Sequence, residues 1–257
     1  VGGNVIKAGV IPTPAVAYLA RHYGADAGIV ISASHNTFEY NGIKFFNGDG
    51  FKLDDLLEEK IEDLIISSVD VNSHITGEEI GKCLEAEGNS IELYAKHLIE
   101  TADFRLDGRK VVLDCANGAS YQVAPKVYEA LGAEVVTIGD RPDGTNINDA
   151  CGSTHPEKLQ AAVLAHHADI GLAFDGDADR LIVVDERGRV LDGDKTIAIC
   201  AKMLKAEGRL KDDKVTVTVM SNIGFHKAME AEGISVDVTG VGDRYVLEQM
   251  LKTGCVI

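Results

Sequence analysis

Short apolar runs with the period of a β-strand alternate with segments of helical period along most of this 257-residue chain. The alternation is most regular between residues 110 and 174. A strand–helix–strand order normally closes as a crossover between parallel strands, so this segment predicts a parallel sheet covered by helices. The expected elements are strand 110–113, helix 122–131, strand 134–138, helix 156–165 and strand 170–174.

The same rhythm continues on both sides of this segment. Upstream we expect strands at 5–10, 28–32 and 42–46 and helices at 13–23, 54–67 and 91–101, with a polar connection at 69–89. Thr13 precedes Pro14, which predicts that its hydroxyl caps the first helix. Downstream we expect a hairpin of strands 181–184 and 189–191, helix 194–207, strand 215–219, helix 223–233, strand 235–238 and helix 243–252.

The chain therefore belongs to the α/β class, and we predict consecutive α/β units with mixed, mostly parallel sheets covered by helices. The units are expected at residues 1–100, 101–210 and 211–257. The chain starts beside one strand-like segment and stops at the apolar Cys255, Val256 and Ile257. Because natural termini are usually polar and frayed, we expect both outer units to be incomplete.

The amino-acid composition argues against some classes of binding partner. Asp and Glu number 41 against 25 Lys and Arg, which gives a net charge of −16 without any basic block. This charge argues against nucleic acid or an anionic membrane as a partner. The chain has no apolar run long enough for a membrane helix, and its five cysteines are widely spaced. An odd cysteine number without a CxxC pair suits a reducing cytoplasm.

The sharpest local feature is an acidic loop, Asp175-Gly-Asp-Ala-Asp-Arg180, between two apolar strands. Three carboxylates at alternate positions can surround one hard cation, and they repel one another without it. A solvated acidic turn is the alternative. An EF-hand is disfavoured because Arg180 stands where that loop needs glycine and because the flanks are strands. Mg²⁺ bridging to a phosphate is favoured over a full Ca²⁺ cage.

A second loop, Ser32-Ala-Ser-His-Asn36, follows the predicted strand 28–32. Loops at strand ends of open α/β sheets commonly bind ligands, although an ordinary Ser/Asn turn would have the same composition. A Ser–His hydrolase is disfavoured, since the loop lacks the GxSxG elbow and adjacent extended residues point to opposite sides. Lys44, inside an apolar strand, needs an anionic partner, and a phosphate would serve.

Together these loops resemble the α-D-phosphohexomutases, and the similarity runs from end to end of the chain. Two further segments resemble the phosphoglucosamine mutase branch of that family. The segments that carry the resemblance are Ile31-Ser-Ala-Ser-His-Asn36, Asn41-Gly-Ile-Lys-Phe-Phe46, Asp175 to Arg180, Asn146-Ile-Asn148 with Cys151-Gly-Ser-Thr-His-Pro-Glu157, and Gly240-Val-Gly-Asp-Arg-Tyr-Val246.

The resemblance implies a cytoplasmic isomerase of the phosphotransferase type. It would interconvert glucosamine 6-phosphate and glucosamine 1-phosphate through a hexose 1,6-bisphosphate, for amino-sugar nucleotide and cell-wall precursor synthesis. Ser34 would carry the phosphoryl group, and Ser34 with Asp175, Asp177 and Asp179 would hold Mg²⁺.

The resemblance also implies roles for residues around these two loops. Lys44 or Arg180 would orient the sugar hydroxyl or exchange its proton, and His35 would shape the serine loop. Gly242, Asp243 and Arg244 are expected substrate contacts, although Asp243 could simply cap its helix. A homodimer is a possible assembly.

The chain departs from the family pattern at Thr37 and Tyr40, where proline and aspartate are usual; we expect altered loop stiffness rather than lost chemistry. The family's sugar-binding Glu-x-Ser-Gly motif and its C-terminal phosphate-binding domain do not occur in these residues. We therefore expect negligible turnover from residues 1–257 alone. Open alternatives are a phosphomannomutase/phosphoglucomutase, a non-catalytic metal- or phosphate-binding module, and a structural domain with a solvated acidic loop.

Overall fold

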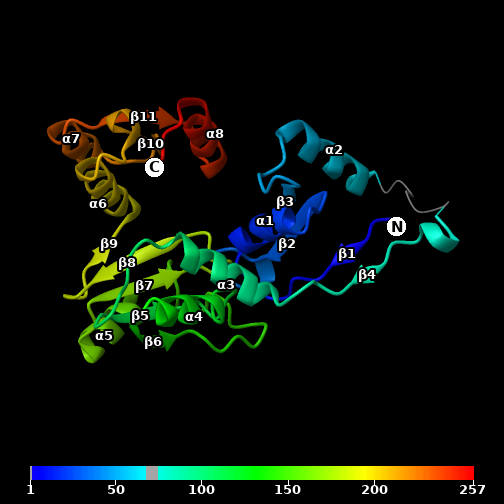
Figure 1. Ribbon diagram of the computed structural model, residues 1–257, viewed down its shortest axis with the longest axis horizontal. Coiled ribbons are helices and arrows are strands. Elements are labelled where there is room, and N and C mark those ends of the chain that lie inside the picture. The colour runs from blue at the N-terminus through cyan, green and yellow to red at the C-terminus, as the bar shows by residue number, and fades with distance from the viewer. Residues whose placement is uncertain (1, 68–74) are drawn as a thin grey trace. The chain divides into compact units, whose positions relative to one another are not determined.

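The computed structural model describes residues 2–67 and 75–257, and the chain divides into two compact units, Val1–Gly188 and Arg189–Ile257. Figure 1 shows helices and strands alternating along the chain. The predicted α/β class with mixed sheets is confirmed. Part of the polar connection predicted at 69–89 lies outside the described residues. Among the helices that the structure describes, none is long and apolar enough to cross a membrane.

The N-terminal part of the first unit contains a β-hairpin whose strands are preceded and followed by helices. Ser32, the last residue of one strand, lies opposite Gly42, the first residue of the next. The elements are β1 (Val5–Ile6), α1 (Thr13–His22), β2 (Ala27–Ser32), β3 (Gly42–Asn47), α2 (Asp55–Ile66), β4 (Cys83–Leu84) and α3 (Ser90–Thr101).

The first strand is shorter than the predicted 5–10. It consists of Val5 and Ile6, which pair in parallel with the two residues of β4, a strand that the sequence pattern did not reveal. Gly9 has a φ of +81°, a left-handed conformation that an extended strand does not contain. The apolar run therefore ends as a strand before it reaches Val10.

The second part of the first unit is built on a sheet in the order β6-β5-β7-β8, in which β5 pairs in parallel with β6 and β7. β8 runs antiparallel to β7. Val111, Val112 and Leu113 of β5 are all at most 1% exposed. The elements are β5 (Lys110–Asp114), α4 (Val123–Ala130), β6 (Glu134–Ile138), α5 (Glu157–His166), β7 (Ile170–Phe174) and β8 (Leu181–Asp185).

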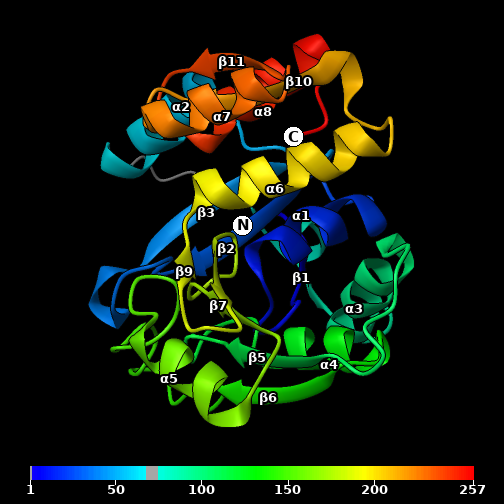
Figure 2. The ribbon, with the colours of Figure 1, turned by 90° about the vertical axis from the view of Figure 1, so that its left-hand side faces the viewer.

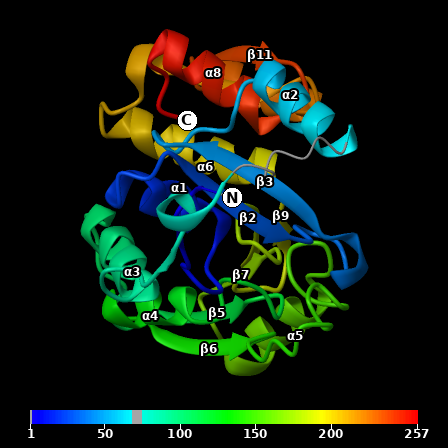
Figure 3. The same cartoon turned by 90° about the vertical axis from the view of Figure 1, so that its right-hand side faces the viewer.

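A shared apolar core joins the two parts of this unit. Helix α1 packs against β2, and α3 packs against both α1 and α4 (Figure 3). This packing fixes the start of α1 and the end of β2 relative to the sheet that contains β5 and β7. The core residues are Ile11, Ala15, Leu19, Tyr94, Ala95, Val123, Val127 and Leu131.

The second unit has its own parallel strand pair and its own core. β10 and β11 pair along their full length, and α7 packs on β11 (Figure 2). Val215, Phe225 and Met229 are buried at the centre of this core. The elements are β9 (Val190–Leu191), α6 (Gly193–Ala206), β10 (Lys214–Thr218), α7 (Ile223–Ala231), β11 (Ser235–Thr239) and α8 (Asp243–Thr253).

Candidate active site and metal centre

The serine loop after β2 and the aspartate loop after β7 are in direct contact within the first unit. The backbone N–H of Gly176 donates a hydrogen bond to the carbonyl oxygen of Ser34, with an N···O distance of 3.1 Å. A Cβ atom at Gly176 would lie 2.6 Å from that oxygen. Only glycine allows so close an approach, so the glycine of the acidic loop brings the two predicted site segments together.

Ser34 sits in a tight turn with a left-handed backbone. Its φ is +53°, and its N–H donates to the Oγ of Ser32 at 2.8 Å. The N–H of Asn36 donates to the carbonyl of Ala33 at 2.9 Å and closes the turn. A non-glycine residue with positive φ is uncommon and is held by its surroundings. The Nδ1 atom of His35 is buried and has no partner among the described residues, and the loop-shaping role of His35 stays a prediction.

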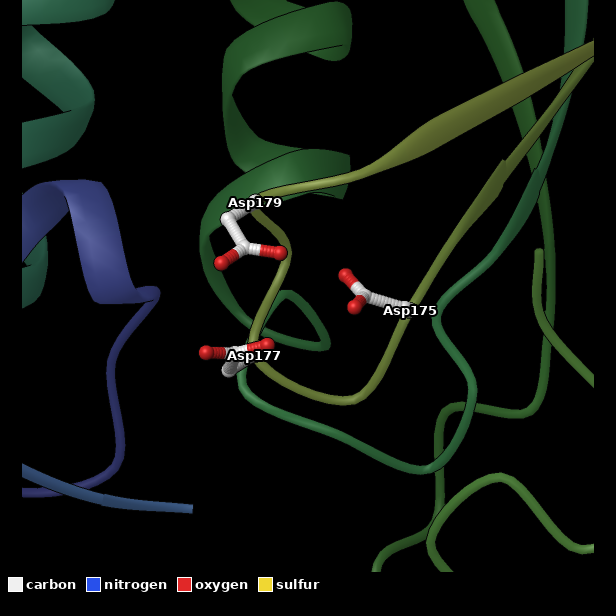
Figure 4. Close-up of side chains that lie close together, drawn as sticks. All are labelled: Asp175, Asp177 and Asp179. Atoms are coloured by element: carbon white, nitrogen blue, oxygen red, sulfur yellow. The ribbon is translucent and has the colours of Figure 1, made fainter. Parts of the chain in front are cut away.

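The three aspartates of the acidic loop converge, as Figure 4 shows, and one oxygen from each lies within 4.8 Å of the others. Asp175 and Asp177 are 0% and 3% exposed, whereas Asp179 is exposed. Asp175 Oδ2 and Asp177 Oδ1 are buried and have no hydrogen-bond partner among the described residues. Buried carboxylate oxygens without a partner are costly, and oxygen donors of this kind are those that Mg²⁺ prefers. The donor set therefore fits a divalent cation.

The pKa values of the aspartates reflect this crowding. Burial, together with the negative charges of Asp179 and Asp177, raises the pKa of Asp175 to about 6. Burial also acts to raise the pKa of Asp177, but hydrogen bonds from Lys44 and Thr13 outweigh it and lower that pKa below its ordinary value. The loop thus holds more negative charge than its own residues can neutralise.

Lys44 supplies a cation to this cluster. Its Nζ lies 2.6 Å from Asp177 Oδ2 and 2.8 Å from Asp179 Oδ2. Partial burial acts to lower the pKa of Lys44, but the two carboxylates outweigh it and raise that pKa. The anionic partner expected for this lysine therefore consists of two aspartates. Arg180 is exposed, and its backbone N–H donates to Asp175 Oδ1 at 3.1 Å.

Thr13 differs from its prediction. The N-cap of α1 is Pro12, no side chain caps the helix, and Thr13 is the first helical residue. The hydroxyl of Thr13 donates to Asp177 Oδ2 at 2.5 Å, and its backbone N–H donates to the Asp177 carbonyl at 2.8 Å. Because Thr13 is the first helical residue and not the N-cap, this hydroxyl contacts the acidic loop instead of capping α1. Sequence reasoning missed this contact.

A Thr13→Val variant is expected to lower the free energy of unfolding by about 1.5–3 kcal/mol, because a buried carboxylate loses a hydrogen-bond donor while the side chain keeps its shape. Thr13 is 4% exposed, so water does not replace the hydroxyl easily. Urea unfolding followed by circular dichroism measures the change. Thr13→Ser keeps the hydroxyl and is the matched control. A Thr13→Val variant that is as stable as the unaltered protein would show that the hydrogen bond to Asp177 does not stabilise the fold.

The predicted substrate contacts lie in the second unit. Gly242 is the N-cap of α8 and has a φ of +138°, and Asp243 is the first residue of the helix. The Nε of Arg244 donates to Glu248 Oε1 at 3.3 Å, one turn further along α8. A substrate-binding role for these three residues stays a prediction.

Three protein-family models match the chain in succession. Residues 1–70 match phosphoglucomutase/phosphomannomutase α/β/α domain I, residues 92–188 match domain II and residues 192–257 match domain III. Both loops of the site lie inside these matches: the serine loop belongs to the domain I segment and the aspartate loop to the domain II segment.

The chain is also similar to individual proteins of the same family. The chain is similar to phosphoglucosamine mutases of Clostridioides difficile (strain 630), at 56% identity over 99% of this chain, and of Thermoanaerobacter sp. (strain X514), at 57% over 99%. It covers 56% of each, so it spans about half the length of these curated relatives. A phosphoglucomutase/phosphomannomutase family protein of Burkholderia thailandensis has a similar fold, with a TM-score of 0.79 and 25% identity over 98% of this chain and 55% of that one.

Proposed function

Since the chain belongs to the phosphoglucomutase/phosphomannomutase family, we propose that the protein interconverts glucosamine 6-phosphate and glucosamine 1-phosphate. One observation carries the proposal: the loop with Ser34 and the loop with the three aspartates touch through the Gly176 N–H and the Ser34 carbonyl. The identity to phosphoglucosamine mutases supports this sugar over the glucose or mannose phosphates.

In the proposed reaction, Ser34 Oγ carries a phosphoryl group. The P–O bond to Ser34 breaks, a P–O bond to the free sugar hydroxyl forms, and the sugar becomes a 1,6-bisphosphate. After the intermediate turns over, its other phosphoryl group returns to Ser34. Phosphoryl transfer of this kind depends mainly on positioning and on stabilisation of charge.

Different residues around the two loops would position the reacting groups and stabilise the charge of the phosphoryl group. Asp175, Asp177 and Asp179, with an oxygen of the phosphoserine, would hold Mg²⁺, which supplies positive charge for the transferring phosphoryl group. Lys44, fixed between two of the carboxylates, places a further cation beside the same loop. His35, Lys44 and Arg180 flank the two loops. Lys44 or Arg180 would orient the sugar hydroxyl or exchange its proton, which ends on Ser34 Oγ when the phosphoryl group leaves. Gly242, Asp243 and Arg244 would contact the sugar phosphate.

The remaining predictions form part of the same proposal. The segments 1–100, 101–210 and 211–257 would act as a phosphoserine part, a metal-binding part and the beginning of a third part. Hexose 1,6-bisphosphate would activate the enzyme by phosphorylating Ser34. The protein would work in the cytoplasm, with a homodimer as its possible assembly.

The proposal is tested on the complete gene product that contains this sequence. We expect it to convert glucosamine 6-phosphate into glucosamine 1-phosphate, followed by ³¹P NMR, in the presence of Mg²⁺ and a trace of glucose 1,6-bisphosphate. The same assay with mannose 6-phosphate and glucose 6-phosphate compares sugar preference. Faster turnover of either hexose phosphate would favour the phosphomannomutase/phosphoglucomutase alternative. Turnover of none of the three would favour a non-catalytic module.

A further inference from the structure

Asn148 is a buried residue from the connection between β6 and α5 that contacts the serine loop. It is 4% exposed and has a left-handed backbone with a φ of +56°. Its backbone N–H donates to the carbonyl of Ala116 at 2.9 Å, which ties it to the loop that follows β5. The backbone of Asn148 is therefore anchored beside the end of β5 in the first unit.

The side chain of Asn148 extends from this anchor to both ends of the serine turn. Its Nδ2 donates to the carbonyl of Ser34 at 2.8 Å and to the carbonyl of Asn36 at 2.7 Å. A carboxamide NH₂ has two N–H donors, so both are used on this one turn. Because both neighbours are acceptors, the NH₂ group, and not the amide oxygen, faces the turn.

The carbonyl of Ser34 thereby accepts two hydrogen bonds from distant segments, one from Asn148 and one from Gly176. Ser34 itself has an unfavourable left-handed backbone. The peptide that follows Ser34 is thus fixed on one side by the acidic loop and on the other by Asn148. The direction of the Ser34 side chain depends on this backbone, because Cβ and the carbonyl share one Cα atom.

We propose that Asn148 is a positioning residue for phosphoryl transfer, which holds the Ser34 turn so that Ser34 Oγ stays aligned with the aspartate loop. The inference rests on the proposed function. Asn148 does so through Ser34 and Asn36 and is not itself assigned a contact with the sugar. Misplacement of a reacting group by about 1 Å can reduce the rate on the order of 100-fold.

Two substitutions test the proposal in the complete gene product. Asn148→Gly removes the side chain and tolerates the left-handed backbone, whereas Asn148→Asp keeps the shape but turns a carboxylate oxygen toward two carbonyl oxygens. The matched control is Asn117→Gly. Asn117 is also left-handed, with a φ of +47°, but its side chain bonds to Arg141 and Asn146 and not to the serine turn.

We expect kcat to fall by about 10- to 100-fold in both Asn148 variants, with the KM for glucosamine 6-phosphate within about threefold of the unaltered protein. The control should keep kcat within about threefold. Hydrogen–deuterium exchange read by mass spectrometry should show faster exchange at residues 33–37 in the Asn148 variants and unchanged protection in β5.

The other possible results would overturn either the role of Asn148 or the proposed function. A kcat within about threefold of the unaltered protein in both variants, or unchanged exchange at 33–37, overturns the role of Asn148. Protection lost in β5 as well shows a general structural role and overturns it too. If the unaltered gene product turns over none of the sugar phosphates, the proposed function fails, and the exchange experiment still decides whether Asn148 orders the turn.

Discussion

A Ser34→Ala variant of the complete gene product is expected to lose mutase activity by about 10⁴-fold or more, because no other group replaces the nucleophile that carries the phosphoryl group. The fold should survive. The hydrogen bonds that shape the turn use the N–H and the carbonyl of residue 34 and the Oγ of Ser32, and alanine keeps the two backbone groups. The melting temperature should change by no more than a few degrees.

The measurement combines turnover with the location of the phosphate. The unaltered protein is incubated with glucose 1,6-bisphosphate and Mg²⁺, and intact mass and peptide mapping then place one phosphoryl group on Ser34. Thr37→Ala is the matched control, since it removes an exposed hydroxyl from the same loop and should leave phosphorylation intact. Phosphate retained by Ser34→Ala, or turnover near that of the unaltered protein, would contradict the phosphoserine mechanism.

The strands and helices of the central sheet were predictable because their periods are unambiguous. The apolar runs of β5 and β7 indicated strands buried on both faces, and the structure places both inside a helix-covered sheet. The acidic loop was also evident, since three carboxylates between apolar strands need a cation. These features depend on residues close together in the sequence.

The contacts that complete the site were not predictable in the same way. Thr13 and Asp177 are separated by 164 positions, and Asn148 and Ser34 by 114. Local pattern contains no information about such pairs. A Thr-Pro pair is typical of a helix start, and the same hydroxyl serves equally well as a donor to a distant carboxylate. The strand β1 was predicted too long and β4 was not predicted at all, because a strand of two residues is too short to show a period.

The anion that pairs with Lys44 is the clearest example of what the sequence alone could not predict. A lysine within an apolar strand predicted an anion, and the sequence could not distinguish a substrate phosphate from a protein carboxylate. Antiparallel pairing places Lys44 opposite Val30 in the β2–β3 hairpin, and from there its Nζ contacts Asp177 and Asp179. The Lys44 cation is therefore paired with the carboxylates of the aspartate loop.

A Lys44→Met variant is expected to lower kcat by about 10²- to 10³-fold, the usual effect of removing one fixed group that stabilises transition-state charge. Methionine keeps most of the apolar stem, so the hairpin should remain folded. Kinetics at saturating Mg²⁺ measure the loss. Lys96→Met is the control for a general change in charge, because Lys96 is a 73%-exposed surface residue paired with Glu100 on α3.

The same variant should bind Mg²⁺ several-fold more tightly, although it turns over more slowly. Lys44 neutralises one of the three aspartate charges, so its loss leaves the loop more negative and attracts a cation more strongly. Isothermal titration calorimetry with Mg²⁺ measures the dissociation constant of the variant and of the unaltered protein. The opposite directions of the two effects separate charge stabilisation from metal retention. If Mg²⁺ binding instead weakened and saturating Mg²⁺ restored kcat, Lys44 would serve to organise the metal ligands and not to stabilise the transferring phosphoryl group.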